Sequence, residues 1–208
     1  MNEGNEMHVG HPLWDELRNG LLWHRTSPEH WRKIQSESFV KPNDGWLNRW
    51  GGRYACQQLG GISLFDFTSQ SEERALGEAH KWQQFLGDSS PITILLGFER
   101  KSLRGKLVPY PDNAEGTAGN VIPWVEVCHC GAISTAAIVA HLLICAVDYR
   151  QFRKVKTLNE QALDDAEQAF SKFIEQDRTR QAALNESIRA INESQEFKEA
   201  KRKANEMM

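Results

Sequence analysis

Glu126 is the residue of this chain whose type and setting most clearly suggest chemistry. It lies between Val125 and Val127 in an otherwise apolar segment. A charged group is costly to bury without a partner or a task. Glu126 is therefore a functional carboxylate that stabilises positive charge, an edge-strand residue that faces solvent, or the partner of a buried arginine.

A second group of polar residues, His24, Arg25 and Thr26, follows the apolar segment Leu21–Trp23. The forked guanidinium of Arg25 is suited to binding phosphate, and Thr26 supplies a hydroxyl beside it. The alternatives are ordinary: His24 as a structural histidine at a strand end, and Arg25 as a solvated surface residue.

The elements that must position these residues follow from the apolar patterns. Ser27 suits a helix N-cap and Pro28 the first helical position. Period-2 and period-3.6 patterns predict a short helix over 13–18, a strand over 20–24, a helix ending near 39, a loop over 41–61, a strand over 61–67, a helix over 69–86, strands over 91–98 and 121–130, and a buried helix over 133–149.

The order of these features resembles the ADP-ribosyltransferase-like fold. That family places a His or Arg on its first strand, a Ser or Tyr on a second element and a Glu on a later strand, as His24, Ser63 and Glu126 stand here. The resemblance covers residues 21–130. It implies an α+β fold whose split β-sheet core, with flanking helices, forms an NAD-binding cleft.

The resemblance also implies an activity, with NAD as the substrate. The chain would transfer ADP-ribose, or hydrolyse NAD, with Glu126 stabilising an oxocarbenium-like ribose. His24 would position NAD, and Arg25 and Thr26 would assist at ribose or phosphate. Ser63 would line the nicotinamide side with Phe65, whose ring would either stack on nicotinamide or belong to the core.

Two departures from the family pattern bear on the acceptor. Many members have Ser-Thr-Ser where this chain has Ser63-Leu64-Phe65, and arginine-directed members place a carboxylate or Gln where Trp124 stands. An arginine acceptor is therefore not expected, which leaves another protein side chain, a nucleic acid or water. Four tryptophans could stack on bases or could be core and loop anchors: Trp23, Trp31, Trp46 and Trp50.

A metal site is the rival chemistry. Cys128 and Cys130 would share a strand face, and His141 and Cys145 would lie one turn apart on the predicted helix. Four such ligands could hold zinc, although the spacing is not that of a zinc finger and buried Cys behaves as a small hydrophobe. We expect no metal.

Composition narrows the class of protein. The net charge of −3 does not demand a nucleic-acid partner, and the glycine signatures of Rossmann, P-loop and α/β-hydrolase enzymes are not found. Residues 131–147 are too short and too interrupted for a membrane span, and residues 1–10 do not resemble a secretory signal. We expect a cytoplasmic protein with reduced thiols and no membrane association.

We predict three parts: a lead-in over 1–20, the ADP-ribosyltransferase-like domain over 21–150, and a helical extension over 151–208. Residues 150–208 hold 12 Lys and Arg against 11 Asp and Glu, with no Pro or Gly, which favours helix. Their narrow apolar stripe would dock on the domain or on a protein partner. The alternative function is therefore a non-catalytic binding or inhibitory protein that acts through the same fold and this helix.

Overall fold

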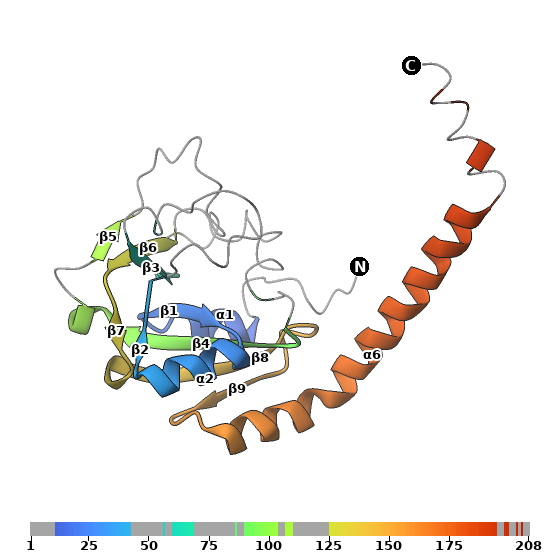
Figure 1. Cartoon of the computed structure of the whole chain (residues 1–208). Coiled ribbons are helices and arrows are strands. Elements are labelled where there is room, and N and C mark those ends of the chain that lie inside the picture. The colour runs from blue at the N-terminus through green and yellow to red at the C-terminus, as the bar shows by residue number, and fades with distance from the viewer. Residues whose placement is uncertain are drawn as a thin grey trace. The chain divides into compact units, whose positions relative to one another are not determined.

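A computed structural model describes residues 11–42, 56, 60–68, 86, 90–103, 107–109, 125–194, 198–199, 203 and 205 (Figure 1). The chain divides into two compact units, Met1–Phe170 and Ser171–Met208. The first unit is a mixed α/β fold around a large antiparallel sheet, and the long helix α6 (Glu160–Glu193) begins in it. The predicted α+β class with a long C-terminal helix is confirmed, and the ADP-ribosyltransferase-like core remains a prediction.

Seven strands form the main sheet, in the order β5-β6-β3-β1-β4-β8-β9, and every neighbouring pair is antiparallel. Their bounds are β1 Leu21–Thr26, β3 Gly61–Phe65, β4 Ile92–Glu99, β5 Leu107–Pro109, β6 Glu126–Cys130, β8 Ile138–Cys145 and β9 Phe152–Val155. A separate small sheet pairs β2 (Phe39–Val40) with β7 (Ile133–Ser134). The described residues of this unit also form the 3₁₀ turns η2 (Arg100–Leu103) and η3 (Thr135–Ala137).

The predicted passage from a strand into a helix capped by Ser27 is confirmed. β1 is followed directly by α2 (Pro28–Glu37), whose N-cap is Ser27. The Ser27 hydroxyl accepts a hydrogen bond from the backbone N–H of His30 at 3.2 Å, which satisfies one of the free donors at the helix start. α2 ends at Glu37, and its C-cap, Ser38, adopts the left-handed conformation with φ 60°. This tight strand-to-helix passage fixes the end of β1, where His24 and Arg25 lie.

Helix α1 (Pro12–Leu17) covers one face of the sheet. Its buried residues Leu13, Trp14 and Leu17 join a core cluster with Trp23 of β1 and Tyr149. The indole Nε1 of Trp23 donates to the carbonyl of Leu17 at 3.0 Å, so the aromatic core is tied to the helix by a satisfied polar group.

Helix α2 covers the opposite face. Its Trp31 packs edge-on against the ring of His141 on β8, with centroids 5.3 Å apart. His141 lies opposite Leu96 of β4, and Leu96 lies opposite His24 of β1. Because paired residues in antiparallel strands project to the same face, His24, Leu96 and His141 all project toward α2.

The predicted buried helix over 133–149 is wrong. The segment forms β7, η3 and the long strand β8, which lies between β4 and β9. Since β8 is buried for most of its length and both faces of the sheet are covered, it has no polar face, and its sequence lacks the alternation that marks a strand. Within the part of the chain that the structure describes, no helix is long and apolar enough to cross a membrane.

Several predictions concern residues outside those that the structure describes. They are the helix over 69–86 except Leu86, most of the loop over 41–61, and the positions of Trp46, Trp50 and Trp124. The predicted strand over 121–130 is observed from Glu126 onward as β6.

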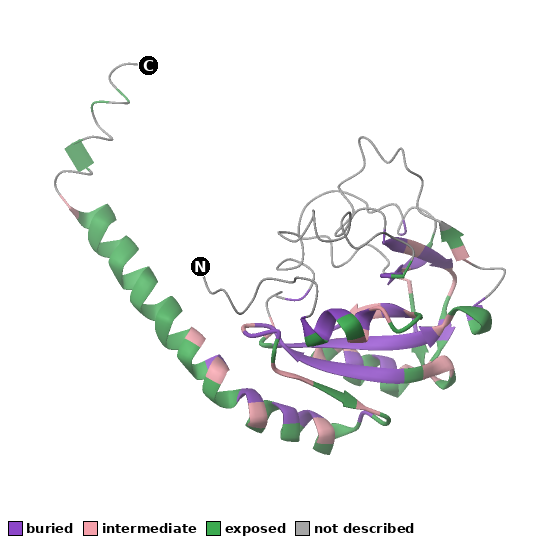
Figure 2. Cartoon of the chain, turned by 180° about the vertical axis from the view of Figure 1, so that it is seen from behind, coloured by how far each residue is buried: buried purple, intermediate pink, exposed green. Residues whose placement is uncertain are grey.

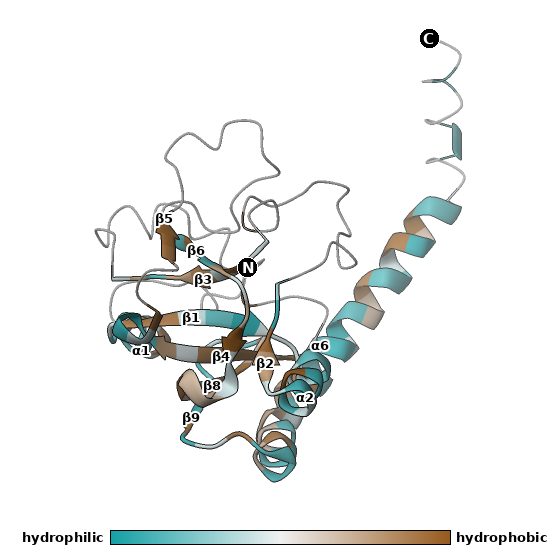
Figure 3. Cartoon of the chain, turned by 60° about the vertical axis from the view of Figure 1, so that its left-hand side comes forward, coloured by the Kyte–Doolittle hydropathy of each residue, from teal (hydrophilic) through white to brown (hydrophobic). Residues whose placement is uncertain are grey.

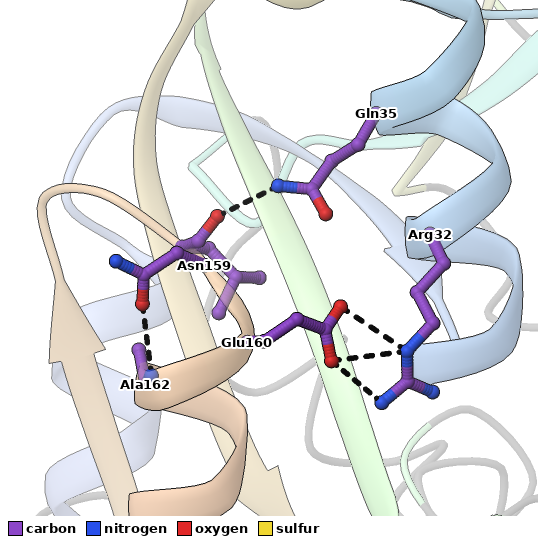
Figure 4. Close-up of polar contacts among 6 residues, drawn as sticks. Arg32, Gln35, Asn159, Glu160 and Ala162 are labelled. Carbon is purple, nitrogen blue, oxygen red and sulfur yellow. Dashed lines mark hydrogen bonds and ion pairs between the residues drawn. The ribbon is translucent and has the colours of Figure 1, made fainter.

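The first turns of α6 are anchored to α2 (Figure 4). Arg32 donates to both carboxylate oxygens of Glu160, and Gln35 donates to the carbonyl of Leu158 at 3.0 Å. Asn159 caps α6, because its Oδ1 accepts from the N–H of Ala162 at 2.9 Å. Burial along the helix is concentrated in these turns, at Leu163, Ala166 and Phe170, and the later turns are almost wholly exposed (Figure 2).

Candidate functional site

A buried carboxylate–hydroxyl pair joins β3 to β6. Ser63 Oγ donates a hydrogen bond to Glu126 Oε1 at 2.5 Å. In the register of these strands Phe65 lies opposite Glu126, and Ser63 lies opposite Cys128. Ser63 is therefore the diagonal neighbour of Glu126 on the same face of the sheet. The structure brings together two of the residues that the sequence singled out, although they are 63 positions apart in the chain.

The surroundings of Glu126 disfavour the ionised form of its carboxyl group. The side chain is 4% exposed, and this burial raises the pKa of its carboxyl, while the hydrogen bond from Ser63 lowers that pKa and so favours the ionised form. Of the three sequence interpretations, a solvent-facing residue is excluded. A carboxylate held in a poorly solvated place interacts strongly with any positive charge that develops beside it.

The backbone pairing between β1 and β3 is short. β1 pairs with β4 along all six of its residues, whereas its pairing with β3 is limited to Trp23 opposite Phe65. Next to this residue pair, the His24 side chain bridges the two strands: its Nδ1 lies 3.0 Å from the carbonyl oxygen of Ser63. With Nδ1 protonated, the imidazole donates to that carbonyl in place of a backbone N–H. His24 therefore stands where the ladder between the two halves of the sheet is interrupted.

The predicted residues of the first strand fall on opposite faces. Trp23 shares the α1 face with Phe65, and Phe65 shares it with Glu126, because these residues are cross-strand partners. Alternation along β1 places Arg25 on that same face and places His24 and Thr26 on the α2 face. Arg25, and not His24, therefore projects on the side of Ser63 and Glu126. His24 reaches the pair only through the backbone of Ser63.

The surroundings of His24 favour its uncharged form. Burial lowers its pKa, and the charges of Arg25 and His30 lower it further, against the raising effect of the hydrogen bond to Ser63. A neutral imidazole with Nδ1 engaged has its other nitrogen, Nε2, as an acceptor, which suits a hydroxyl donor.

The remaining predicted residues have well-defined surroundings. Phe65 is buried in the α1-side core and stacks on Phe67, with ring centroids 6.4 Å apart. Thr26 is buried at the end of β1. Burial raises the pKa of Tyr149 to about 12, and the positive charge of Arg25 opposes that rise. Stacking of nicotinamide on Phe65 stays a prediction, and it requires the ring to be uncovered.

Two thiols adjoin the carboxylate, which the sequence analysis did not anticipate. Cys128 lies opposite Ser63, its Sγ is 3.9 Å from the carbonyl of Cys56, and burial raises the pKa of both thiols. Gly61 makes room for this sulfur, because a Cβ at that position would lie 2.2 Å from Cys128 Sγ. Alternation along β6 places Cys128 on the same face as Glu126. The position of Cys128 opposite Ser63, however, depends on the register of β3 and β6, which cannot be read from the sequence.

The rival metal site is not formed. Cys128 and Cys130 lie on β6, whereas His141 and Cys145 lie on β8, four strand positions away in the sheet order. Four inter-strand spacings amount to about 19 Å, so these residues do not share an ion. Among the residues that the structure describes, no cluster of three or more His, Cys, Asp or Glu could hold a metal.

The tryptophans that were candidates for base stacking are core residues where they are described. Trp23 is fully buried and hydrogen-bonded to Leu17, and Trp31 is buried against His141. Neither indole presents a free face for a base.

Comparison of the chain with protein-family models, with curated proteins and with solved structures gives no match. The site therefore consists of a buried carboxylate oriented by a hydroxyl, an arginine on the same face of the sheet, and a buried histidine where the pairing of β1 with β3 is reduced to one residue pair.

Proposed function

We propose that this chain transfers ADP-ribose from NAD to a protein or nucleic-acid acceptor, or hydrolyses NAD, with Glu126 as the catalytic residue. The observation that carries the proposal is the hydrogen bond from Ser63 to the buried carboxylate of Glu126. The two residues lie on neighbouring strands, beside the strand that carries His24 and Arg25. These are the residue types, in the order along the chain, on which the family resemblance rests.

The reaction breaks the bond between C1′ of the ribose and the nicotinamide nitrogen. The electron pair of that bond leaves with nicotinamide, and positive charge develops on the ribose. The acceptor nucleophile then forms a new bond to C1′ and releases its proton to solvent. When water is the nucleophile, the products are ADP-ribose, nicotinamide and one proton.

Glu126 stabilises the ribose cation by charge, and Ser63 keeps the carboxylate oriented and ionised. Arg25, on the same face, is placed to donate its fork to the NAD phosphates. His24 bridges β1 to β3 through its hydrogen bond to the carbonyl of Ser63, and so positions the strand from which Arg25 projects. Thr26 supports this end of β1 from the α2 face.

The test is release of nicotinamide from NAD by the full chain, compared with its Glu126→Gln variant. Glu186→Gln is the matched control, because it makes the same change at an exposed position of α6. Release that Glu126→Gln abolishes and Glu186→Gln retains supports the proposal, provided that NAD still raises the melting temperature of the Glu126→Gln variant.

If NAD neither loses nicotinamide nor raises the melting temperature of the wild-type chain, the NAD proposal is wrong. An increase in melting temperature without release favours the second candidate function, a non-catalytic binding or inhibitory protein. One observation speaks for that candidate: α6 carries exposed large aliphatic side chains, Leu184, Ile188 and Ile191.

A further inference from the structure

The unit Ser171–Met208 has an exposed apolar stripe. Leu184, Ile188 and Ile191 of α6 are 51%, 47% and 58% exposed. They make up half of the exposed large hydrophobic side chains in the described part of the chain; the others are Phe39, Val108 and Val139. Residues four and three positions apart lie on one side of a helix, so these three side chains share one side of α6. The ribbon of α6 alternates between teal, hydrophilic bands and brown, hydrophobic ones (Figure 3).

The spacing of this stripe is that of a coiled-coil seam. Steps of four and then three residues, from Leu184 to Ile188 to Ile191, are the steps between the two core positions of a heptad. Extending the pattern back by one heptad places Gln181 and Asp177 in the same seam. The seam is therefore apolar at its distal end and polar at its proximal end.

The distal part of α6 has few packing contacts that would stabilise it as a helix. From Glu175 to Glu193 all residues but Asp177 are exposed, and helices gain most of their stability from packing of an apolar face. The intrahelical ion pair from Arg189 to Glu193 adds little at the surface. A second helix laid along the seam would supply the missing packing.

We propose that the occupant of this seam is the same helix of a second copy of the chain, in antiparallel orientation. Charge is the first argument. Residues 171–194 contain four basic and four acidic side chains, Lys172, Arg178, Arg180 and Arg189 against Glu175, Asp177, Glu186 and Glu193. The segment is neutral, so a strongly charged partner gains nothing from it and a second copy is not repelled.

The position of Asp177 selects the orientation. A parallel, in-register pair would face Asp177 with its own copy inside the seam, which places two like charges together. An antiparallel pair centred near residue 186 sets Leu184 against Ile188 of the second copy, and Gln181 against Ile191.

The flanks of the antiparallel seam agree with this arrangement. Arg178 and Arg180 lie beside the seam at its proximal end, and Asn192 and Ser194 lie beside it at the distal end. Antiparallel pairing sets the two arginines opposite these uncharged residues, so no like charges meet.

The test is the association state of the full chain by sedimentation equilibrium over a concentration series. We expect a reversible monomer–dimer equilibrium that the double variant Leu184→Glu with Ile188→Glu converts to monomer. Ala183→Glu with Ala190→Glu is the matched control, because it adds the same two charges away from the seam and should still dimerise. Circular dichroism of each variant checks that the helix persists.

Disulfide trapping then tests the orientation, in a Cys130→Ser background that removes the partly exposed native thiol. Asn185→Cys should cross-link efficiently, because antiparallel pairing brings position 185 close to its own copy, whereas Ile191→Cys should not. A monomer at all concentrations, or a dimer that survives the two seam glutamates, overturns the proposal. Cross-linking through Ile191→Cys in place of Asn185→Cys overturns the antiparallel arrangement.

Discussion

Ser63 donates a hydrogen bond to Glu126 from the diagonal position of the β3–β6 pair, while the residue directly opposite Glu126 is Phe65. The carboxylate is thus held between an aromatic neighbour that excludes water and a hydroxyl that favours its ionised form. These two influences shift the pKa of Glu126 in opposite directions, and burial is the larger. A fold gains little stability from such an arrangement, whereas a catalytic site needs a carboxylate that is both poorly solvated and oriented.

Replacing Glu126 by Gln should therefore stabilise the fold at neutral pH, because the folded variant no longer has to bury a charged carboxylate. Because the pKa of Glu126 is raised on folding, the folded chain binds more protons than the unfolded chain at a pH between the two pKa values. Wild-type stability then falls as pH rises from near the unfolded pKa through the folded one. The gain from Glu126→Gln should be large at neutral pH and should shrink toward zero in acid.

Urea unfolding at several pH values measures this difference, with Glu186→Gln as the exposed control. An equal effect of the two variants, or a wild type that is the more stable at neutral pH, would show that burial of Glu126 carries no cost.

Ser63→Ala should raise the pKa of Glu126 further, since it removes the hydrogen bond that favours the ionised carboxylate. The carboxyl ¹³C shift of Glu126, followed as pH is varied, reports that pKa without any assay of activity. If the proposed chemistry holds, the acid limb of the pH profile for nicotinamide release should move to higher pH by the same amount. Ser63→Thr keeps the hydroxyl and should restore most of the wild-type pKa, and an unchanged pKa in Ser63→Ala would contradict the role given to Ser63.

Gly61→Ala should destabilise the chain through one identified clash, because its Cβ would lie 2.2 Å from Cys128 Sγ. We expect a loss of about 1–3 kcal/mol. Cys128→Ala removes the sulfur, so Gly61→Ala should cost clearly less in that background, although the carbonyl of His129 remains 3.0 Å from the new Cβ. Thermal or urea unfolding of the wild type, the two single variants and the double variant measures the coupling between the two positions. If the losses of stability were additive, the new Cβ would not clash with Cys128 Sγ.

Much of the fold could be predicted from local patterns, and the main error has a physical cause. The cap at Ser27, the alternation in β3 and the charged helix after residue 160 are signals that a single segment carries. β8 is covered on both faces, so its sequence is apolar throughout and is equally compatible with a buried helix. Only its partners, β4 and β9, make it a strand, and pairing is not a local property.

The candidate site shows the same limit. The types and order of His24, Ser63 and Glu126 indicated a shared site, and the structure brings the last two into contact. The division of His24 and Arg25 between the two faces follows from alternation alone, but which face belongs to Glu126 depends on the single rung between Trp23 and Phe65. The thiols of Cys56 and Cys128 meet beside the carboxylate through a register that no local pattern encodes.

Within the unit Met1–Phe170, the packing of the first turns of α6 should depend on apolar burial rather than on the ion pair between Arg32 and Glu160 that Figure 4 shows. Phe170 is buried on the third turn of α6, and Phe170→Ala should lower the free energy of unfolding by about 3–5 kcal/mol, the usual cost of removing a buried phenyl ring. Arg32 and Glu160 are each about half exposed, and solvent-exposed pairs contribute little because water and salt screen them. Arg32→Ala should therefore leave the melting temperature nearly unchanged. Unfolding of both variants by urea, repeated at high salt, separates the two contributions, and a large salt-sensitive loss in Arg32→Ala would show that the ion pair anchors the helix.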